Sequence, residues 1–201
     1  MDSSNTDHAK TIPHEREWEF VNRKGRHSIN VQLVVNADLI ITNCVVKWPG
    51  SVHDARLLRE SHIFRHLQQK PPDGIILGDS VYQLLPWLMT PFAMVNNDAE
   101  ERFNCAHGRT RSTIECLNGV LKRRSACLNY LPVDPQRACN IILACIVLHY
   151  IAEERKVPHC DGRGDHSQPQ ADRPDLPLAA LQPDGAAGRS MRDALMNHYF
   201  T

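Results

Sequence analysis

The stretch INVQLVV, residues 29–35, alternates apolar with polar side chains along most of its length. This period of two is typical of a half-buried strand. Turn-forming residues flank it: NRKGR, residues 22–26, leads back to WEFV, residues 18–21, and NAD, residues 36–38, leads on to LIITNCVV, residues 39–46. Three sequential strands with short connections predict an antiparallel meander.

One more strand and several helices are predicted after the meander. The run IILG, residues 75–78, has the composition of a short buried strand, and it delivers Asp79 at its carboxyl end, where open α/β sheets present ligands. Helices are predicted over residues 53–67, 110–124 and 135–156. The last of them is apolar on most sides, so we expect it to be buried. The predicted fold class is therefore α/β, with a three-strand meander and a further strand flanked by helices.

The two ends of the chain differ from this core. Residues 1–12 are polar, lack the apolar segment of a secretory signal, and fit an irregular segment or an incomplete opening strand. Residues 157–188 are rich in proline, glycine and aspartate and predict a disordered linker. Residues 189–201 predict a short amphipathic helix that docks back, which leaves residues 1–156 as one domain. The apolar run 141–152 is too short to span a bilayer, so we expect a soluble protein without a membrane partner.

The charge of the chain is balanced overall but not locally. Lys and Arg number 23 and Asp and Glu number 23, and a neutral total does not exclude nucleic acid, because phosphate contact depends on local clusters. Residues 101–130 hold six basic side chains against two acidic ones. The candidates for phosphate contact are Arg109, Arg111, Lys122, Arg123 and Arg124. The alternative is an ordinary solvated helix end, because cations there also suit the helix dipole.

Seven cysteines occur, none of them in a C-x-x-C pair. Several stand in apolar runs such as IILACIVL, residues 141–148. We therefore expect reduced, buried thiols of an intracellular protein, since a zinc site needs closely spaced ligands.

Three carboxylates stand out by position. Asp54 follows a Pro-Gly turn at a predicted helix start, Asp79 ends the buried strand, and Glu115 lies within a helix that is otherwise basic. Two divalent cations about 4 Å apart need several carboxylates converging from separate elements, which such a set could supply. By spacing alone an alternative stays open, in which Asp54 complements the helix dipole and Glu115 pairs with Arg111 one turn away.

A series of short motifs resembles the Harbinger transposase-derived nucleases, in the order of that family and across roughly residues 17–155. The matching words are FVNRKGRHSINVQ (residues 20–32), KWPGSVHD (47–54) with LLRES (57–61), LGDS (77–80) with Tyr82, PWLMTP (86–91), residues 100–104 and 111–115, GVLKRR (119–124) and ILACIVLH (142–149). The set is far more specific than any single word in it.

The resemblance implies an RNase H-like α/β fold with a DDE-type site that binds Mg²⁺ or Mn²⁺. Carried over residue by residue, Asp54, Asp79 and Glu115 fall on the family's metal-binding, catalytic carboxylates. The implied activity is hydrolysis of DNA phosphodiester bonds without a covalent enzyme intermediate. The resemblance also implies DNA as a partner, together with a Myb-like DNA-binding protein, and location in the nucleus and also in the cytoplasm.

Several positions depart from the family pattern. The family's first carboxylate lies on the opening strand, at a position near Ser4, and Asp2 or Asp7 would reach it only through a register shift that changes the face of the strand. The helical domain expected upstream of the core has no counterpart, and Tyr150 stands where Asn is usual. Two functions therefore lead: a nuclease weakened by the missing ligand, and a catalytically dead, domesticated transposase that binds DNA or a partner protein. A purely structural protein without either role is the third alternative.

Overall fold

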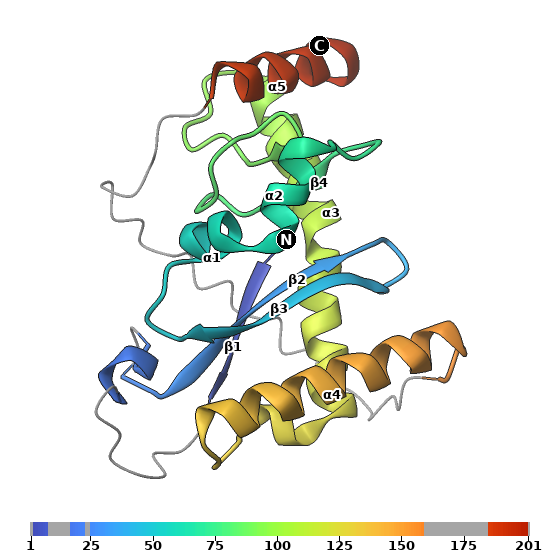
Figure 1. The fold of residues 1–201 in the computed structure, drawn as a ribbon. Coiled ribbons are helices and arrows are strands. Elements are labelled where there is room, and N and C mark those ends of the chain that lie inside the picture. Colours follow the sequence, from blue (N-terminus) through green and yellow to red (C-terminus); the bar gives the residue numbers. More distant parts are fainter. Residues whose placement is uncertain (1, 8–16, 23–24, 159–184, 201) are drawn as a thin grey trace. The chain divides into compact units, whose positions relative to one another are not determined.

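The structure, a computed structural model, describes residues 2–7, 17–22, 25–158 and 185–200 (Figure 1). The chain forms two compact units. The first, here called the sheet unit, comprises Asp2–Leu57 and Thr113–Pro169; the second, here called the α5 unit, comprises Leu58–Ser112 and Gln170–Thr201. Helices and strands occur in both, as the sequence predicts for a mixed α/β chain.

The sheet unit contains an antiparallel sheet of β1 (Asp2–Asp7), β2 (Ser28–Val35) and β3 (Ile41–Pro49), in that order. The outer strand next to β2 is therefore β1, and the strand predicted at residues 18–21 is wrong. Those residues belong to the short 3₁₀ helix η1 (Glu17–Phe20) and to an isolated bridge between Val21 and His27. Because β1 and β3 occupy both edges of β2, residues 18–21 have no edge of that strand to extend along.

The turn between β2 and β3 is held by a side chain. Asn36 accepts the backbone N–H groups of Asp38 and Ile40 through Oδ1, each at 3.0 Å. Leu39 adopts a φ of 61° in this turn. Residues 39–40 therefore belong to the turn, and β3 begins at Ile41, two residues later than predicted.

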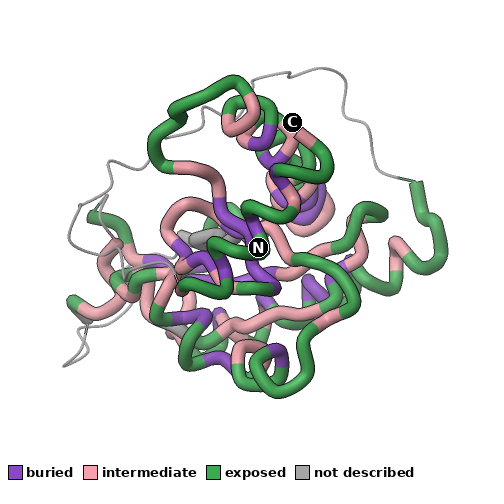
Figure 2. Tube along the Cα trace, turned by 90° about the horizontal axis from the view of Figure 1, so that it is seen from above, coloured by how far each residue is buried: buried purple, intermediate pink, exposed green. Residues whose placement is uncertain are grey.

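Strand β2 is buried on both faces over Ser28–Leu33. Figure 2 shows how buried and exposed residues are distributed along the chain. The apolar face of β2, Ile29, Val31 and Leu33, belongs to the core of the sheet unit. The same core takes in Leu117 from α3 (Asp98–Arg124) and Ile142 from α4 (Pro135–Glu154). Its polar face is also buried and consists of Ser28, Asn30 and Gln32. The alternating side chains of β2 therefore form one apolar and one polar face, and both faces are buried, whereas the sequence pattern predicted that the polar face is exposed to solvent.

Helix α3 begins at Asp98, well before the predicted start at residue 110. Asn97 caps it, because its Oδ1 accepts the N–H of Glu100 at 2.9 Å. Glu100 in turn accepts the N–H of Asn96 at 2.7 Å. Acidic residues in this first turn complement the helix dipole and favour the start of this 27-residue helix at Asp98.

The single helix predicted over residues 53–67 is two helices, α1 (Asp54–Glu60) and α2 (His62–Gln69). Ser61 separates them: its hydroxyl donates to the carbonyl of Leu58 at 2.5 Å and accepts the N–H of Phe64 at 3.2 Å. A serine with this pair of bonds ends one helix and caps the next.

Helix α4 begins where the sequence predicts, behind Asp134, whose side chain accepts the N–H of Arg137 at 3.0 Å. The predicted burial on most sides is wrong, however. Ile142 and Ile146 are buried in the core, whereas Val147 and Leu148 on the opposite side are exposed.

The α5 unit is built around two short parallel strands, β4 (Ile76–Leu77) and β5 (Leu88–Met89), with α2, the first half of α3 and α5 (Ala186–Tyr199). Strand β5 was not predicted from the sequence. The core consists of Leu84, Met89, Phe103 and Met196. Gly188 packs so closely that a Cβ there would lie 2.7 Å from the carbonyl oxygen of Leu84.

The cysteines of the described segments are all free thiols. Cys145 is buried as expected, but the expectation of burial is wrong for Cys105, Cys116 and Cys127, which are exposed. Cys160 and residues 159–184 of the predicted linker lie outside the described residues.

Candidate active site

Asp79 is the second residue after β4, close to the strand end where the sequence predicts it, and is half-buried. Gly78, between the strand and Asp79, donates its N–H to the carbonyl of Met89 at 2.9 Å. A Cβ on Gly78 would lie 3.0 Å from Leu88 and 3.2 Å from Tyr82, so glycine suits this close approach. Beyond it the chain turns at once, because Tyr82 donates its N–H to the carbonyl of Asp79 at 3.1 Å. The carboxylate itself accepts the N–H of Ser80 at 2.7 Å, which fixes its orientation.

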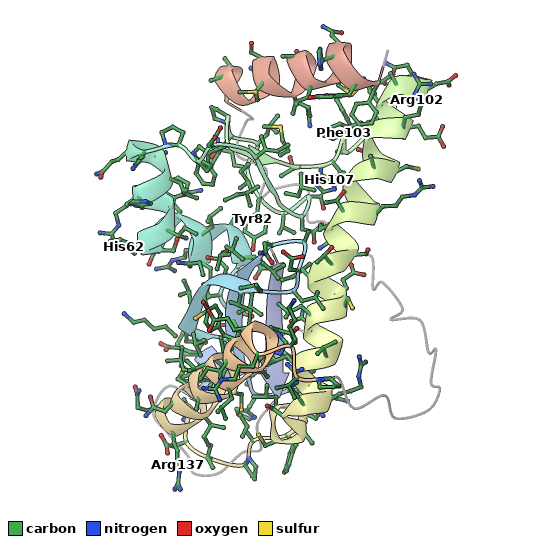
Figure 3. All side chains as sticks on the ribbon, turned by 90° about the vertical axis from the view of Figure 1, so that its right-hand side faces the viewer. His62, Tyr82, Arg102, Phe103, His107 and Arg137 are labelled. Atoms are coloured by element: carbon green, nitrogen blue, oxygen red, sulfur yellow. The ribbon has the colours of Figure 1, made fainter. Side chains whose placement is uncertain are left out.

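Two side chains of α3 bond to β5, the strand paired with β4, and to the loop after β5. The amide of Asn104 bonds to Phe92 in both directions, accepting its N–H at 2.9 Å and donating to its carbonyl at 3.0 Å. One turn further on, His107 Nε2 lies 3.2 Å from the carbonyl oxygen of Met89 (Figure 3). These two side chains, here called the α3 clamp, were not predicted from the sequence, because the helix predicted for this region begins only at residue 110.

The environment of His107 favours its neutral form. Burial lowers the pKa of His107 below its ordinary value of 6.5, and the positive charge of Arg111 adds to this, while the carbonyl groups of Met89 and Gly78 act against it. In the neutral ring, Nε2 carries the proton that the carbonyl of Met89 accepts. The α3 clamp is thus an uncharged support for the strand pair.

Asp54 is delivered by a turn that the polar face of β2 holds in place. Gly50 donates its N–H to the carbonyl of Ser28 at 2.9 Å, and a Cβ at Gly50 would lie 2.1 Å from the Ser28 hydroxyl oxygen. Asn30 donates from Nδ2 to the carbonyl of Val52 at 2.6 Å. The backbone carbonyl of Ser28 and the buried side chain of Asn30 therefore set the start of α1, where Asp54 is the acidic residue of the first turn.

Glu115 lies in the second half of α3 and is half-buried. Its neighbours Ile114 and Leu117 are buried in the core of the sheet unit, which fixes this part of the helix. Glu115 is therefore a side chain at the margin of the core.

The structure places Asp54 and Glu115 in the sheet unit and Asp79 in the α5 unit. Within the described segments no group of three or more His, Cys, Asp or Glu side chains is close enough to hold a metal ion. The chemistry of the donors still fits: all three are half-buried carboxylates, the hard oxygen donors that Mg²⁺ and Mn²⁺ prefer.

The side chains predicted to contact phosphate differ in their exposure and in the hydrogen bonds they make within the protein. Arg109 and Arg123 are exposed, and Arg111 and Lys122 are half-buried. Arg124 bonds within the sheet unit, donating from Nη1 to Glu153 at 2.7 Å and from Nη2 to the carbonyl of Val157 at 3.0 Å.

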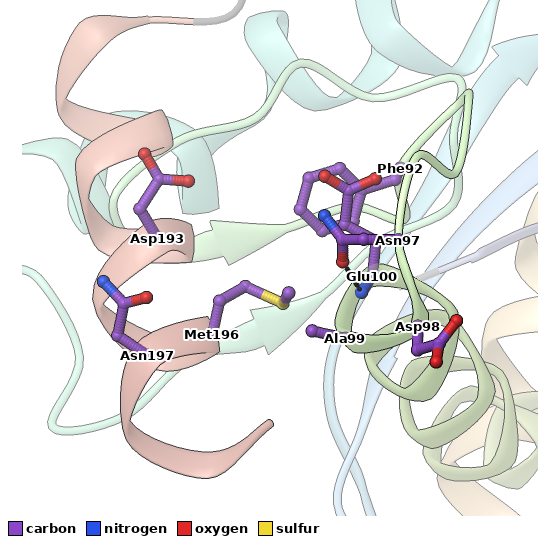
Figure 4. A pocket seen from close by; sticks show the side chains of 8 residues that line it. All are labelled: Phe92, Asn97, Asp98, Ala99, Glu100, Asp193, Met196 and Asn197. Atoms are coloured by element: carbon purple, nitrogen blue, oxygen red, sulfur yellow. Dashed lines mark hydrogen bonds between the residues drawn. The ribbon is translucent and has the colours of Figure 1, made fainter. Parts of the chain in front are cut away.

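A hollow of about 800 Å³ lies in the α5 unit, between the start of α3 and α5 (Figure 4). Its lining includes Asp98, Glu100, Asp193 and Met196. None of the three candidate carboxylates lines it, so this hollow is not the predicted metal site.

Comparison with known proteins identifies relatives of the chain. Residues 1–150 match the family described as DDE superfamily endonuclease. The human and rat proteins named “Putative nuclease HARBI1” are each 37% identical over 147 residues, which is 71% of this chain and 42% of theirs. The HARBI1 protein of Xenopus laevis is 28% identical over 193 residues, or 93% of this chain and 54% of its own. The Arabidopsis thaliana protein named “Protein ALP1-like” is 27% identical over 157 residues, or 69% and 38%.

This chain thus spans about half the length of these relatives or less. No solved structure matches it. Because the family match covers residues 1–150, most of the chain, and HARBI1 proteins are among its relatives, the chain belongs to the DDE superfamily endonucleases and, among them, to the Harbinger transposase-derived nucleases.

Proposed function

We propose that this chain is a transposase-derived nuclease that hydrolyses DNA phosphodiester bonds with the help of Mg²⁺ or Mn²⁺ held by Asp54, Asp79 and Glu115. The observation that supports the proposal is the local structure around Asp79, in a chain that matches the DDE superfamily endonucleases. Asp79 follows the half-buried strand β4, its carboxylate accepts the N–H of Ser80, and the α3 clamp holds the neighbouring strand β5.

Each proposed ligand has a separate structural support. Strand β4 positions Asp79, the turn anchored by Ser28 and Asn30 positions Asp54, and the core packing of α3 positions Glu115. Bound divalent ions would supply activation of a water and stabilisation of the leaving oxygen. Exposed Arg109 and Arg123 would contribute phosphate contacts, which are electrostatic and independent of DNA sequence.

The position of the family's first carboxylate limits the activity. It falls near Ser4, which lies in β1 opposite Val31 and carries no carboxylate. A site that lacks one ligand of a two-metal arrangement binds its ions more weakly, so we propose that cleavage is impaired relative to a complete site.

Nicking of supercoiled plasmid tests the proposal, with Mn²⁺, with Mg²⁺ and with EDTA. Asp79→Asn and Glu115→Gln remove charge at nearly constant shape and should each lower the metal-dependent rate at least tenfold. Asp73→Asn is the matched control, because Asp73 is exposed in the turn before β4. Equal nicking by wild type, Asp79→Asn and Glu115→Gln would remove the nuclease proposal.

The second candidate is a catalytically dead, domesticated transposase that binds DNA or a partner protein. The serine at the position of the first carboxylate favours it. DNA retention without metal-dependent cleavage, with affinity that falls steeply as salt rises, would support it. Absence of both salt-sensitive DNA retention and partner binding would end it.

The partner protein and the location in the cell are inferred from the family resemblance. We propose a Myb-like DNA-binding protein as the recruiting partner and the nucleus as the principal location, with a share in the cytoplasm. Co-precipitation from nuclear extract and imaging of a tagged full chain test these two statements separately.

A further inference from the structure

Two cysteines of the sheet unit lie with their sulfur atoms in contact. The Sγ atoms of Cys127 and Cys145 are 3.9 Å apart, within reach of a thiol–thiol hydrogen bond. Cys127 belongs to the short 3₁₀ helix η2 (Ala126–Asn129) and Cys145 belongs to α4, so the contact joins two elements. A disulfide bond needs its sulfur atoms about 2 Å apart, and rotation of the two side chains can supply the remaining approach.

The local structure explains why the two sulfur atoms meet. Leu128, next to Cys127, is buried in the core and donates its N–H to the carbonyl of Ser125 at 2.9 Å, which fixes η2. Cys145 lies three residues after Ile142 and four before His149, on the buried face of α4. Both cysteines are therefore placed by the packing of the sheet unit.

An ion pair holds the elements on either side of the contact. Arg124 ends α3 three residues before Cys127, and its Nη1 donates to Glu153 of α4 at 2.7 Å. This bond limits how far the chain at η2 can move from α4. The two thiols therefore stay neighbours in the folded protein.

The two thiols differ in exposure. Cys127 is exposed, whereas Cys145 is only 7% exposed. A small oxidant in solution therefore reaches Cys127 first, and Cys145 is then already beside the oxidised sulfur. Cys105 and Cys116 are also exposed, but within the described segments neither has another thiol at such a distance.

We propose that Cys127 and Cys145 are a modification site for hydrogen peroxide, at which oxidation closes an intramolecular disulfide. The thiolate of Cys127 attacks the peroxide: an S–O bond forms, the O–O bond breaks, and Cys127 becomes a sulfenic acid as one water leaves. The sulfur of Cys145 then attacks the sulfur of Cys127, the S–O bond breaks, and a second water leaves. The two thiols thus give two electrons and two protons to one molecule of peroxide.

The surroundings of Cys127 affect the first step and the second step differently. Partial burial raises the pKa of Cys127 above its ordinary value of 9.0, and the hydrogen bond with Cys145 adds to this. Because the thiolate is the nucleophile, the first step should be slower than at an unperturbed exposed thiol. The second step is intramolecular, so it should be faster than further oxidation of the sulfenic acid. The expected product is therefore the disulfide.

The disulfide would close the segment 127–145, which contains the turn before α4 and the first half of that helix. A cross-link of this kind restricts the unfolded chain, so the oxidised protein should unfold at a temperature higher by roughly 5 °C or more. This modification goes beyond the proposed function, and its test does not depend on nuclease activity.

Peptide mapping of the full chain after treatment with hydrogen peroxide tests the proposal. Trypsin places Cys127 in residues 125–137 and places both Cys139 and Cys145 in residues 138–155. Without reduction these two peptides should be found linked, and dithiothreitol should separate them. The link should persist in Cys139→Ser and be lost in Cys127→Ser, which identifies Cys145 as the partner.

Thermal unfolding before and after peroxide gives a second readout. The unfolding temperature should rise in wild type and in Cys116→Ser but not in Cys127→Ser. Cys116→Ser is the matched control, because Cys116 is an exposed thiol of the same unit. Circular dichroism should show the wild-type fold in both variants, and Cys127→Ala replaces Cys127→Ser if the latter does not fold.

Three results would overturn the proposal. The first is a wild-type protein that yields no linked peptides after peroxide, with Cys127 left as a thiol or oxidised alone. The second is a bond from Cys127 to a cysteine other than Cys145. The third is an equal rise of the unfolding temperature in wild type and in Cys127→Ser.

Discussion

Arg124, the last residue of α3, donates from Nη1 to Glu153 of α4 at 2.7 Å, and the two side chains are only 20% and 12% exposed. The same Nη1 lies 3.1 Å from Nδ1 of buried His149. Because an arginine only donates, this nitrogen of His149 is the acceptor, and its Nε2–H points to the carbonyl of Leu39 at 3.4 Å. An ion pair and a histidine thus join α3, α4 and the β2–β3 turn within the sheet unit.

Loss of the carboxylate should destabilise the sheet unit. Glu153→Ala leaves the guanidinium of Arg124 half-buried without its counter-charge, which should cost about 3 kcal/mol in the free energy of unfolding. Adding Arg124→Met to this variant should cost little more. Denaturant unfolding of both single variants and the double variant measures the coupling; strictly additive losses would show that the pair is not coupled.

Arg123 and Arg124 should behave differently in DNA binding. Arg123 is exposed, so Arg123→Ala should weaken retention of duplex DNA and lower the slope of log affinity against log salt by about 1. Arg124→Ala should change the free energy of unfolding more than the salt slope, because its donors are bound within the fold. Binding measured at several salt concentrations checks this, and equal changes in slope for both variants would contradict it.

Two helical glycines of the α5 unit should respond to alanine with opposite signs. A Cβ at Gly188 would lie 2.7 Å from the carbonyl oxygen of Leu84, a backbone atom, so Gly188→Ala should cost about 1–3 kcal/mol. A Cβ at Gly108 meets nothing within 4 Å, so Gly108→Ala should stabilise the protein by about 0.5–1 kcal/mol. Thermal unfolding measures both, and a shift of the same sign would refute the close contact of α5.

Acid should weaken the α3 clamp. The pKa of His107 is lowered in the folded state, mainly by burial, so the unfolded chain takes up a proton first as the pH falls. The stability from the neutral ring is fully present above about pH 6.5, and it is lost as the pH falls through the lower folded-state pKa. His107→Gln retains a donor for Met89 without titrating, so its stability should fall less than that of wild type between pH 7.5 and pH 5. Parallel curves in denaturant titrations would contradict this.

Local sequence patterns predict those strands and helix ends whose formation depends on residues nearby in the chain. Strands β2 and β3, the strand β4 before Asp79, and the start of α4 behind Asp134 follow from alternation, turn residues and capping. The pairing of β1 does not, because the polar run at residues 2–7 carries no apolar alternation and is a strand only through its ladder with β2.

Tertiary partners decide the rest. The sequence reveals neither that Ser28 and Asn30 are buried nor that they hold the turn before Asp54, because polar residues in a strand ordinarily face solvent. Asn104 and His107 were not recognised as a clamp for the same reason: their partners are backbone groups of β5 and the loop after it. For the outer face of α4 the prediction failed in the opposite direction. Its apolar residues were predicted to be buried, but Val147 and Leu148 are exposed.

We propose that Asp79 and Glu115 bind the same divalent ion. The most direct measurement replaces that ion with Fe²⁺ and adds ascorbate and peroxide, so that hydroxyl radicals formed at the ion cut the nearby backbone. Mass spectrometry of the fragments should find cuts close to both residue 79 and residue 115, suppressed by excess Mg²⁺ and absent from Asp79→Asn and Glu115→Gln. Cuts near only one of the two residues, or cuts that persist in both variants, would contradict the account.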